Sequence, residues 1–430
     1  MRSPHVGQGS NSANVRRFNE RLLLQALRRA GEASKADLAR LANLTSTAVG
    51  SIITSLMQSG LIELSGRRLD GGRGQPASLL RLSPRGAFAI GVRLDRTNIE
   101  TVLVNFAGQM IARRSHDMLL PQPAQAQEIV QHDIRELSGL LDKEERKRLA
   151  GIGVAQPYNL GSWLRELGLP SDNFRVWSEV DFAGELGHAL GLPVFSENDG
   201  NAAAIAEIFY GCGRQRDDFL YLFLGPAIGG GIAVGGDCVR GLTGNAGDFA
   251  VMPVPPSTLP SAYQPDGKWD ILLSRASLIA LRRHLQYRGA RVESRADIEG
   301  HIAGGHPAVE EWLDDCIDAL APALRSALCV LDVPAVVLDA DVDAGLIDTL
   351  MERLRWAVAA TAPEARGTPE LVRGTFGPDA GALGAATLPM FFNFSPRAGI
   401  LMGAAATMQT TSQNLMQMQA QAQEVSHVAL

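Results

Sequence analysis

A polar helix face and a glycine-rich turn near the start of the sequence carry groups that can bind a nucleic acid. The helix face presents small and hydroxyl-bearing side chains, which would let a helix enter the major groove closely. The turn, residues 66–76, carries arginines among glycines, which suits contacts with phosphates or the minor groove. We therefore predict binding to double-stranded DNA. The predicted DNA-binding residues are Ser46, Thr47, Gly50, Ser51, Arg67, Arg68, Arg73, Gly74 and Gln75.

Three helices and a hairpin are predicted to position these groups. Ser34 and Asp37 have the spacing of a capping box, and Thr45 is a good N-cap for a helix with apolar residues at i, i+3, i+4 and i+7. The predicted elements are helices from Val15, over about Lys35 to Ala42 and after Thr45, and strands Leu61 to Leu64 and Leu79 to Leu82. Residues 1–82 are thus predicted to form a winged helix-turn-helix. A small helical domain that binds protein is the alternative.

The charge of the chain is unevenly divided. Residues 1–85 carry 13 Lys and Arg against 5 Asp and Glu, a balance of +8. Since the whole chain has a net charge of −6, the rest carries −14. A basic head on an acidic body favours a head that meets a polyanion, although chance surface charge would give the same numbers.

Composition also bears on location and on metal binding. The longest apolar runs, such as Phe219 to Leu224, are far shorter than the roughly 20 residues of a membrane span. The first residues lack the apolar core of a secretory signal, so we expect a cytoplasmic protein without a membrane partner. The four cysteines lack the paired spacing of a metal site.

The larger body is predicted to be α/β and duplicated. Phe88 to Leu94 and Ile99 to Val104 are predicted strands, and a second strand, loop and strand follow at Phe219 to Leu224, 225–231 and Ile232 to Val234. Two such units, each followed by helical segments, predict two lobes with a ligand cleft.

Several motifs resemble those of the ROK family (repressors, open reading frames, kinases) over about residues 14–396. The motifs are Gly72–Ala77, Leu192–Ala204, Gly229–Gly231, Gly244–Gly247 and Gly381–Ala386. The resemblance implies an N-terminal winged helix-turn-helix plus a two-lobed, actin-like sugar-kinase domain, here residues 86–396. It also implies a homodimer or homotetramer that responds to a sugar or sugar derivative.

The resemblance also implies where kinase chemistry would occur and why it is expected to be lost. Asp199 matches the catalytic aspartate of the family. Where family kinases have Asp-x-Gly-Gly-Thr, this chain has Arg93–Thr97, with side chains at the glycines whose amides would approach the phosphates. Pro226 and Ala227 replace a Thr-Gly pair, and a Gly-Gly pair is missing after residues 336–338. We expect no ATP, no other cofactor and no catalysis.

The family's zinc and sugar ligands are altered too. Val251 stands where the resemblance implies a zinc-binding histidine, and no cysteine cluster follows, so no metal is expected. Amides and carboxylates that can bond vicinal hydroxyls beside an aromatic wall remain. The predicted effector-binding residues are Asn173, Trp177, Asn198, Asp199 and Asp248. Core packing is the alternative for Trp177, and a helix cap is the alternative for Asp199.

The sequence therefore predicts a sugar-responsive transcriptional regulator, with a repressor favoured over an activator, whose partners are an operator duplex, a small-molecule effector and further copies of itself. A sugar kinase with an added DNA-binding domain is one alternative, and a scaffold for constitutive DNA binding is another. The Ala-, Met- and Gln-rich tail, residues 397–430, is predicted to be disordered or a loose helix and is assigned no function.

Overall fold

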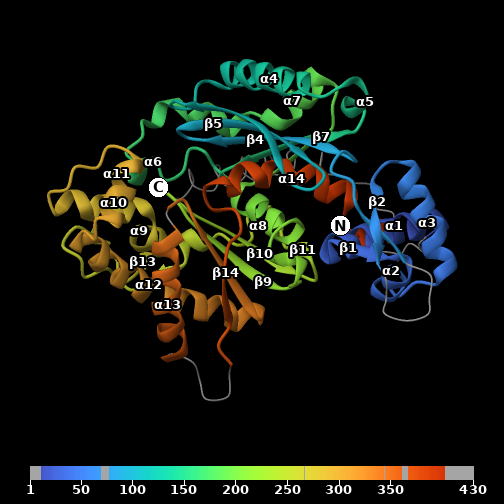
Figure 1. Cartoon of the computed structure of the whole chain (residues 1–430). Helices are drawn as coiled ribbons and strands as arrows, with labels where there is room; N and C mark the ends of the chain where they lie inside the picture. Colours follow the sequence, from blue (N-terminus) through green and yellow to red (C-terminus); the bar gives the residue numbers. More distant parts are fainter. Residues whose placement is uncertain (1–10, 69–76, 266, 343, 361–366, 402–430) are drawn as a thin grey trace, which may run out of the picture. The chain divides into compact units, whose positions relative to one another are not determined.

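A computed structural model describes residues 11–68, 77–265, 267–342, 344–360 and 367–401. The chain divides into unit 1, which is Met1–Ala155, Glu179–Glu197 and Ala385–Leu430, and unit 2, which is Gln156–Ser178 and Asn198–Gly384. Figure 1 shows the elements of both units. Within the described residues, no helix combines the length and the apolar character needed to cross a membrane.

The head of unit 1 forms from local signals. Its elements are α1 (Ser12–Ala30), β1 (Glu32–Ser34), α2 (Lys35–Leu41), α3 (Ser46–Gln58), β2 (Ile62–Arg68) and β3 (Ala77–Leu82). Asn11 caps α1 through the amide of Asn14, so this helix begins before the first apolar position. Both bonds of the predicted capping box of α2 are present.

The wing is a three-stranded antiparallel sheet rather than a bare hairpin. Its strand order is β1-β3-β2, with β1 paired to β3 through Ala33 and Leu80. The sequence prediction missed β1, a strand of three residues whose pairing partner lies almost fifty positions away. This sheet ties the start of α2 to the base of the wing.

The remainder of unit 1 is built on a five-stranded mixed sheet. Its elements are β4 (Phe88–Asp95), β5 (Asn98–Asn105), β6 (Met110–Asp117), α4 (Pro123–Gly139), α5 (Lys143–Arg146), β7 (Leu149–Gln156), α7 (Phe182–Leu190) and β8 (Val194–Asn198). The strand order is β6-β5-β4-β7-β8, with β4 antiparallel to β5 and parallel to β7. The predicted hairpin of Phe88 to Val104 is therefore present.

Unit 2 repeats this sheet. Its strands are β9 (Phe219–Leu224), β10 (Ile228–Val234), β11 (Asp237–Cys238), β14 (Ala335–Ala340) and β15 (Glu370–Arg373). The order is β11-β10-β9-β14-β15, with β9 antiparallel to β10 and parallel to β14, as in unit 1. The prediction of an α/β fold with a helical head and two mixed-sheet lobes is thus confirmed.

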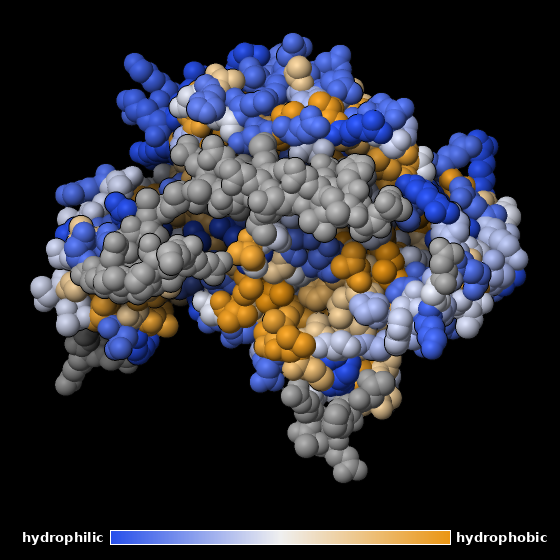
Figure 2. All heavy atoms as spheres, turned by 180° about the vertical axis from the view of Figure 1, so that it is seen from behind, coloured by the Kyte–Doolittle hydropathy of each residue, from blue (hydrophilic) through white to orange (hydrophobic). Residues whose placement is uncertain are grey.

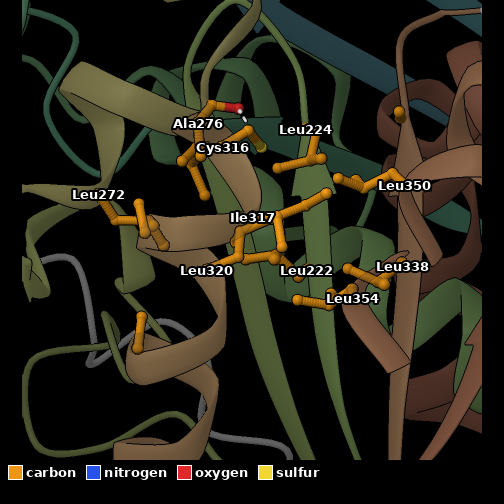
Figure 3. Close-up of a cluster of buried hydrophobic side chains, with 14 of the residues drawn as sticks. Leu222, Leu224, Leu272, Ala276, Cys316, Ile317, Leu320, Leu338, Leu350 and Leu354 are labelled. Carbon is orange, nitrogen blue, oxygen red and sulfur yellow. Dashed lines mark hydrogen bonds between the residues drawn. The ribbon is translucent and has the colours of Figure 1, made fainter. Parts of the chain in front are cut away.

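The helices of unit 2 are α6 (Leu164–Leu167), α8 (Asp199–Phe209), α9 (Leu272–Ala276), α10 (Leu278–Tyr287), α11 (Arg295–Ala303), α12 (Pro307–Leu331) and α13 (Ala344–Ala360). Apolar residues of α9 to α13 pack with those of β9, β10 and β14 in its core. Ile317 and Leu320 of α12 lie against Leu222 of β9 in this core (Figure 3). Burying each such side chain contributes about 1.5–3 kcal/mol. α14 (Ala380–Phe394) begins in unit 2 and ends in unit 1, followed by α15 (Ala398–Leu401).

The surface is mostly hydrophilic on the face drawn in Figure 2, and hydrophobic residues gather in its lower central part. Among the large apolar side chains of unit 2, Leu242, Val330 and Trp356 are more than three-quarters exposed, at 78%, 83% and 76%. Contact with another protein surface would remove them from water.

Candidate DNA-binding surface and effector site

The predicted recognition helix presents the expected residues to solvent. Val49, Ile52 and Leu56 bury one face of α3, and Thr45 caps the helix by accepting from the amide of Ala48 at 3.3 Å. On the opposite face the predicted contact residues Ser46, Thr47 and Ser51 are exposed, and Gly50 is half-buried. The head therefore brings these four residues together on one polar surface.

The base of the wing is held by Asp37. Its carboxylate accepts from both the amide and the hydroxyl of Ser34, and it pairs with Arg40 at 2.8 Å and with Arg68 at 3.0 Å. The Ser34 hydrogen bonds, followed by the Arg68 charge, lower the pKa of Asp37 to about 2. Arg68 thus anchors the wing to α2, a role the sequence did not indicate.

Among the other predicted wing residues, Arg67 alone belongs to the described part of the chain. Arg67 is exposed at the end of β2, as a DNA contact requires. Arg73, Gly74 and Gln75 lie outside the described residues.

The turn between β4 and β5 is where the resemblance implies a phosphate loop, and here it is closed by its own side chains. The amide of Arg96 donates to the Asp95 carboxylate at 2.7 Å, and Arg93 pairs with the same carboxylate at 3.1 Å. Backbone amides of Met118 and Leu120 bond the turn's carbonyls at 3.2 and 2.9 Å. A donor that would face a phosphate is therefore already satisfied by an internal anion.

A second internal carboxylate lies on β14 of unit 2. Asp339 is 3% exposed and accepts from the amides of Ala340 and Gly377, each at 3.0 Å. Burial, followed by the negative charge of Glu207, raises the pKa of Asp339 to about 6. Sequence reasoning marked this segment only for its missing glycines. It did not reveal the buried carboxylate cluster.

Three glycine motifs converge in unit 2 and position the candidate effector residues. A Cβ on Gly200, near the start of α8, would collide with the backbone of Gly230, and one on Gly230 would lie 2.5 Å from the carbonyl oxygen of Gly247. Gly247 itself has a φ of +88°, which only glycine adopts without strain. Any larger side chain at these positions would push α8, β10 and the 244–248 loop apart.

This close packing brings Asn198 and Asp248 to opposite sides of Asn245. The Nδ2 group of Asn245 donates to Asp248 at 2.9 Å, and its Oδ1 accepts from Asn198 at 3.5 Å. Asn245 and the fully buried Asn201, which donates to the Gly244 carbonyl at 3.1 Å, were not predicted, although both lie within quoted motifs. Desolvation of its carboxylate raises the pKa of Asp248 above its ordinary value, and the hydrogen bond from Asn245 offsets part of this rise.

The alternatives for Asp199 are resolved in part by the cap of α8. Asn198, not Asp199, is the N-cap, and its Oδ1 accepts from the amides of Gly200 and Asn201 at 2.9 and 3.2 Å. Asp199 is the first residue of the helix and is half-buried beside this amide and carboxylate group. Its carboxylate accepts from the amide of Gly200 at 2.8 Å, so Asp199 too bonds the first turn of the helix.

The two remaining predicted effector residues lie on short 3-10 turns of unit 2. Asn173 ends the turn Ser171–Asn173 and is half-buried, whereas Trp177, in Arg175–Glu179, is 5% exposed. Such burial is what core packing of Trp177 requires. It leaves little of the indole for a pocket wall.

The resemblance to known proteins covers most of the chain. A profile of the ROK family matches residues 89–390. The xylose repressor of Bacillus spizizenii is 23% identical over 62% of this chain and 68% of that protein. The glucokinase of Thermotoga maritima is 29% identical over 70% of this chain and 96% of that protein.

A solved structure extends the likeness into the head. It is a ROK family transcriptional regulator, a homologue of the E. coli MLC protein, and it is 20% identical with a TM-score of 0.65. The match covers 91% of this chain and 100% of that chain. Because 91% of this chain is more than the segment from residue 89 to residue 430 contains, the match includes part of the segment before the family domain.

Proposed function

Because the chain belongs to the ROK family, we propose that it is a DNA-binding transcriptional regulator of sugar-related genes, a repressor, controlled by a sugar or sugar derivative that it binds without phosphorylating. The observation that carries this proposal is the head in front of the family domain, with its capped α3 and three-stranded wing. Residues 1–82 act as the DNA-binding domain, and residues 86–396 bind the effector and form the oligomer.

The DNA-binding role is supported by the chemistry of the exposed face of α3. Hydroxyls of Ser46, Thr47 and Ser51 can bond base edges or phosphates, and Gly50 adds no side chain of its own to this face. Arg67 and the wing tip carry the positive charge that DNA binding needs. A chromosomal operator as partner places this activity in the cytoplasm.

The absence of phosphoryl transfer is supported by the closed β4–β5 turn. Phosphoryl transfer requires donors that cradle the phosphates and neutralise their charge. Here the Arg96 amide is bonded to Asp95, whose carboxylate also pairs with Arg93. ATP would have to break these bonds before the amide could face a phosphate.

Effector binding is assigned to the group of Asn198, Asp199 and Asp248, with Asn245 completing the set. Amide donors and carboxylate acceptors at this spacing suit neighbouring sugar hydroxyls. The effector changes DNA affinity only as far as it binds the DNA-free and DNA-bound conformations differently. Exposed Val330 and Trp356 are apolar surface that a homodimer or homotetramer would cover.

The test uses duplexes selected from a random library by the purified full chain, with D-xylose, D-glucose and N-acetylated hexoses as effector probes. We expect specific DNA binding that at least one sugar weakens, and no heat of binding on titration with magnesium-ATP. Failure to select any sequence would contradict the DNA-binding role. Specific DNA binding that is unaffected by every sugar would support the constitutive scaffold instead.

A sugar kinase with an added head is the second candidate, favoured by Asp199, which the family resemblance assigns as the catalytic aspartate, and by the similarity to a glucokinase. It predicts ATP binding and sugar-dependent release of ADP. Asp199→Asn separates the two candidates, because it would abolish turnover in a kinase but only change the sugar response of a regulator.

A further inference from the structure

The helix proposed to enter the major groove carries no charge of its own. α3, Ser46–Gln58, contains no Lys, Arg, Asp or Glu. Hydroxyl groups can donate to either kind of base pair and discriminate weakly, whereas a Lys or Arg that bonds guanine O6 and N7 is the commonest specific contact in the major groove. A cation on this face would therefore have to come from another element.

Lys35 of α2 supplies such a cation at the middle of the face. A Cβ on Gly50 would lie 2.6 Å from the Nζ atom of Lys35 and 3.2 Å from its Cε atom. The ammonium group thus occupies the space that a side chain at position 50 would fill. Along the helix this point lies between the exposed Ser46 and Thr47 on one side and Ser51 and Thr54 on the other.

The lysine is also uncommitted, unlike its neighbours. Arg40 and Arg68 both pair with Asp37. Among the described residues, Lys35 is exposed and makes no hydrogen bond or ion pair. An ammonium group that crosses a polar helix with no partner in the part of the chain that the structure describes is available for a ligand.

We propose that Lys35 acts as the long side chain that α3 lacks and donates to a guanine in the major groove, with Gly50 present to leave room for it. The inference rests on the proposed DNA-binding function. Gly50 is the fifth residue of α3, in the N-terminal half where recognition helices contact base edges. A contact with backbone phosphate would instead place the ammonium at the edge of this face.

The experiment compares Lys35→Ala, Gly50→Ala and Lys143→Ala in the full chain, using random-library selection followed by titration of the selected duplex. Lys143 is a matched control because it too is the exposed first residue of a helix with a capping box, α5, outside the head. The methyl group of Gly50→Ala would displace the flexible end of Lys35. Because alanine favours helix formation, we expect all three variants to stay folded. An unchanged melting temperature would then show that a loss of recognition is not caused by unfolding.

Lys35→Ala is expected to lose the preference for guanine at one or two positions and to bind the selected duplex about tenfold more weakly, with non-specific binding little changed. Gly50→Ala should reproduce this loss, the double variant should add nothing further, and Lys143→Ala should behave as the unmodified protein. Uniform weakening on all sequences, with a salt slope reduced by about 0.9, would overturn the proposal in favour of a phosphate contact. Full recognition in both head variants would overturn it too. In either case specific binding by the unmodified chain would leave the proposed function intact.

Discussion

Replacing Asp339 by asparagine is expected to stabilise the protein at pH 8, although it changes a hydrogen-bonded carboxylate. Burial and the charge of Glu207 raise the pKa of Asp339 from 3.8 to about 6. A rise of about two pH units corresponds to about 3 kcal/mol of penalty on the ionised form in the folded state. Asparagine removes the charge but accepts more weakly from the amides of Ala340 and Gly377, so the net gain should be about 1–2 kcal/mol.

The sign of the pH dependence follows from the raised pKa. The folded protein prefers the neutral acid, so this contribution to stability is complete below about pH 4 and is lost as the pH rises through about 6. The difference between Asp339→Asn and the unmodified chain should therefore grow over this window and then level off. Urea unfolding at pH 4, 6 and 8 measures it.

A matched control is Asp348→Asn, an exposed aspartate on α13 whose side chain is 59% exposed. It should change stability little at any pH. If Asp339→Asn instead destabilised the protein equally at pH 4 and pH 8, Asp339 would stabilise the fold as a hydrogen-bond acceptor in either protonation state. The argument from its charge would then be wrong.

Three further substitutions test other contacts. Asp37→Asn removes the capping box and the anchor of Arg68, so it should cost about 1 kcal/mol in urea unfolding at pH 7. Because the pKa of Asp37 is lowered to about 2, this cost should disappear as the pH falls from about 4 to about 2. Arg275→Ala leaves Asp315, 7% exposed and paired to Arg275 at 2.6 Å, buried without its main cation, and should cost about 3–5 kcal/mol in the same assay. Gly230→Ala should lower the melting temperature and any sugar response together, since its methyl group would push the 244–248 loop away from β10; a variant with unchanged melting and response would show that these segments need not touch.

The helices of the head were predictable because their signals are local. The capping box at Ser34 and Asp37 lies within four residues, and its two hydrogen bonds form within one helical turn. The same holds for Thr45 and for the apolar positions i, i+3, i+4 and i+7 of α3, which are Val49, Ile52, Ile53 and Leu56, except that Ile53 is only half-buried. Two strands of each five-stranded sheet were predicted as apolar runs, together with the hairpin of β4 and β5, but the order of the strands within each sheet was not.

Features that depend on contacts between distant positions could not be predicted. β1 exists because Glu32–Ser34 pairs with β3, and Arg68 meets Asp37 across 31 positions. A strand of three residues has too few apolar positions to show an alternating pattern. The contacts of Asn245 with Asn198 and Asp248 could not be predicted for the same reason, because they form only when three glycine motifs that are distant in the sequence pack together.

The two internal carboxylates, Asp95 and Asp339, differ in whether the sequence reveals them. Asp95 was noticed because it replaces a glycine within a turn, and its own neighbour Arg96 supplies the amide that it accepts. Asp339 accepts an amide from Gly377, 38 positions away, so nothing near it in the sequence marks it as a buried anion. Each carboxylate occupies backbone donors on an element where the family resemblance implies nucleotide binding. We therefore predict that a nucleotide would have to displace one internal anion in unit 1 and another in unit 2, and we expect both units, rather than one altered loop, to disfavour ATP binding.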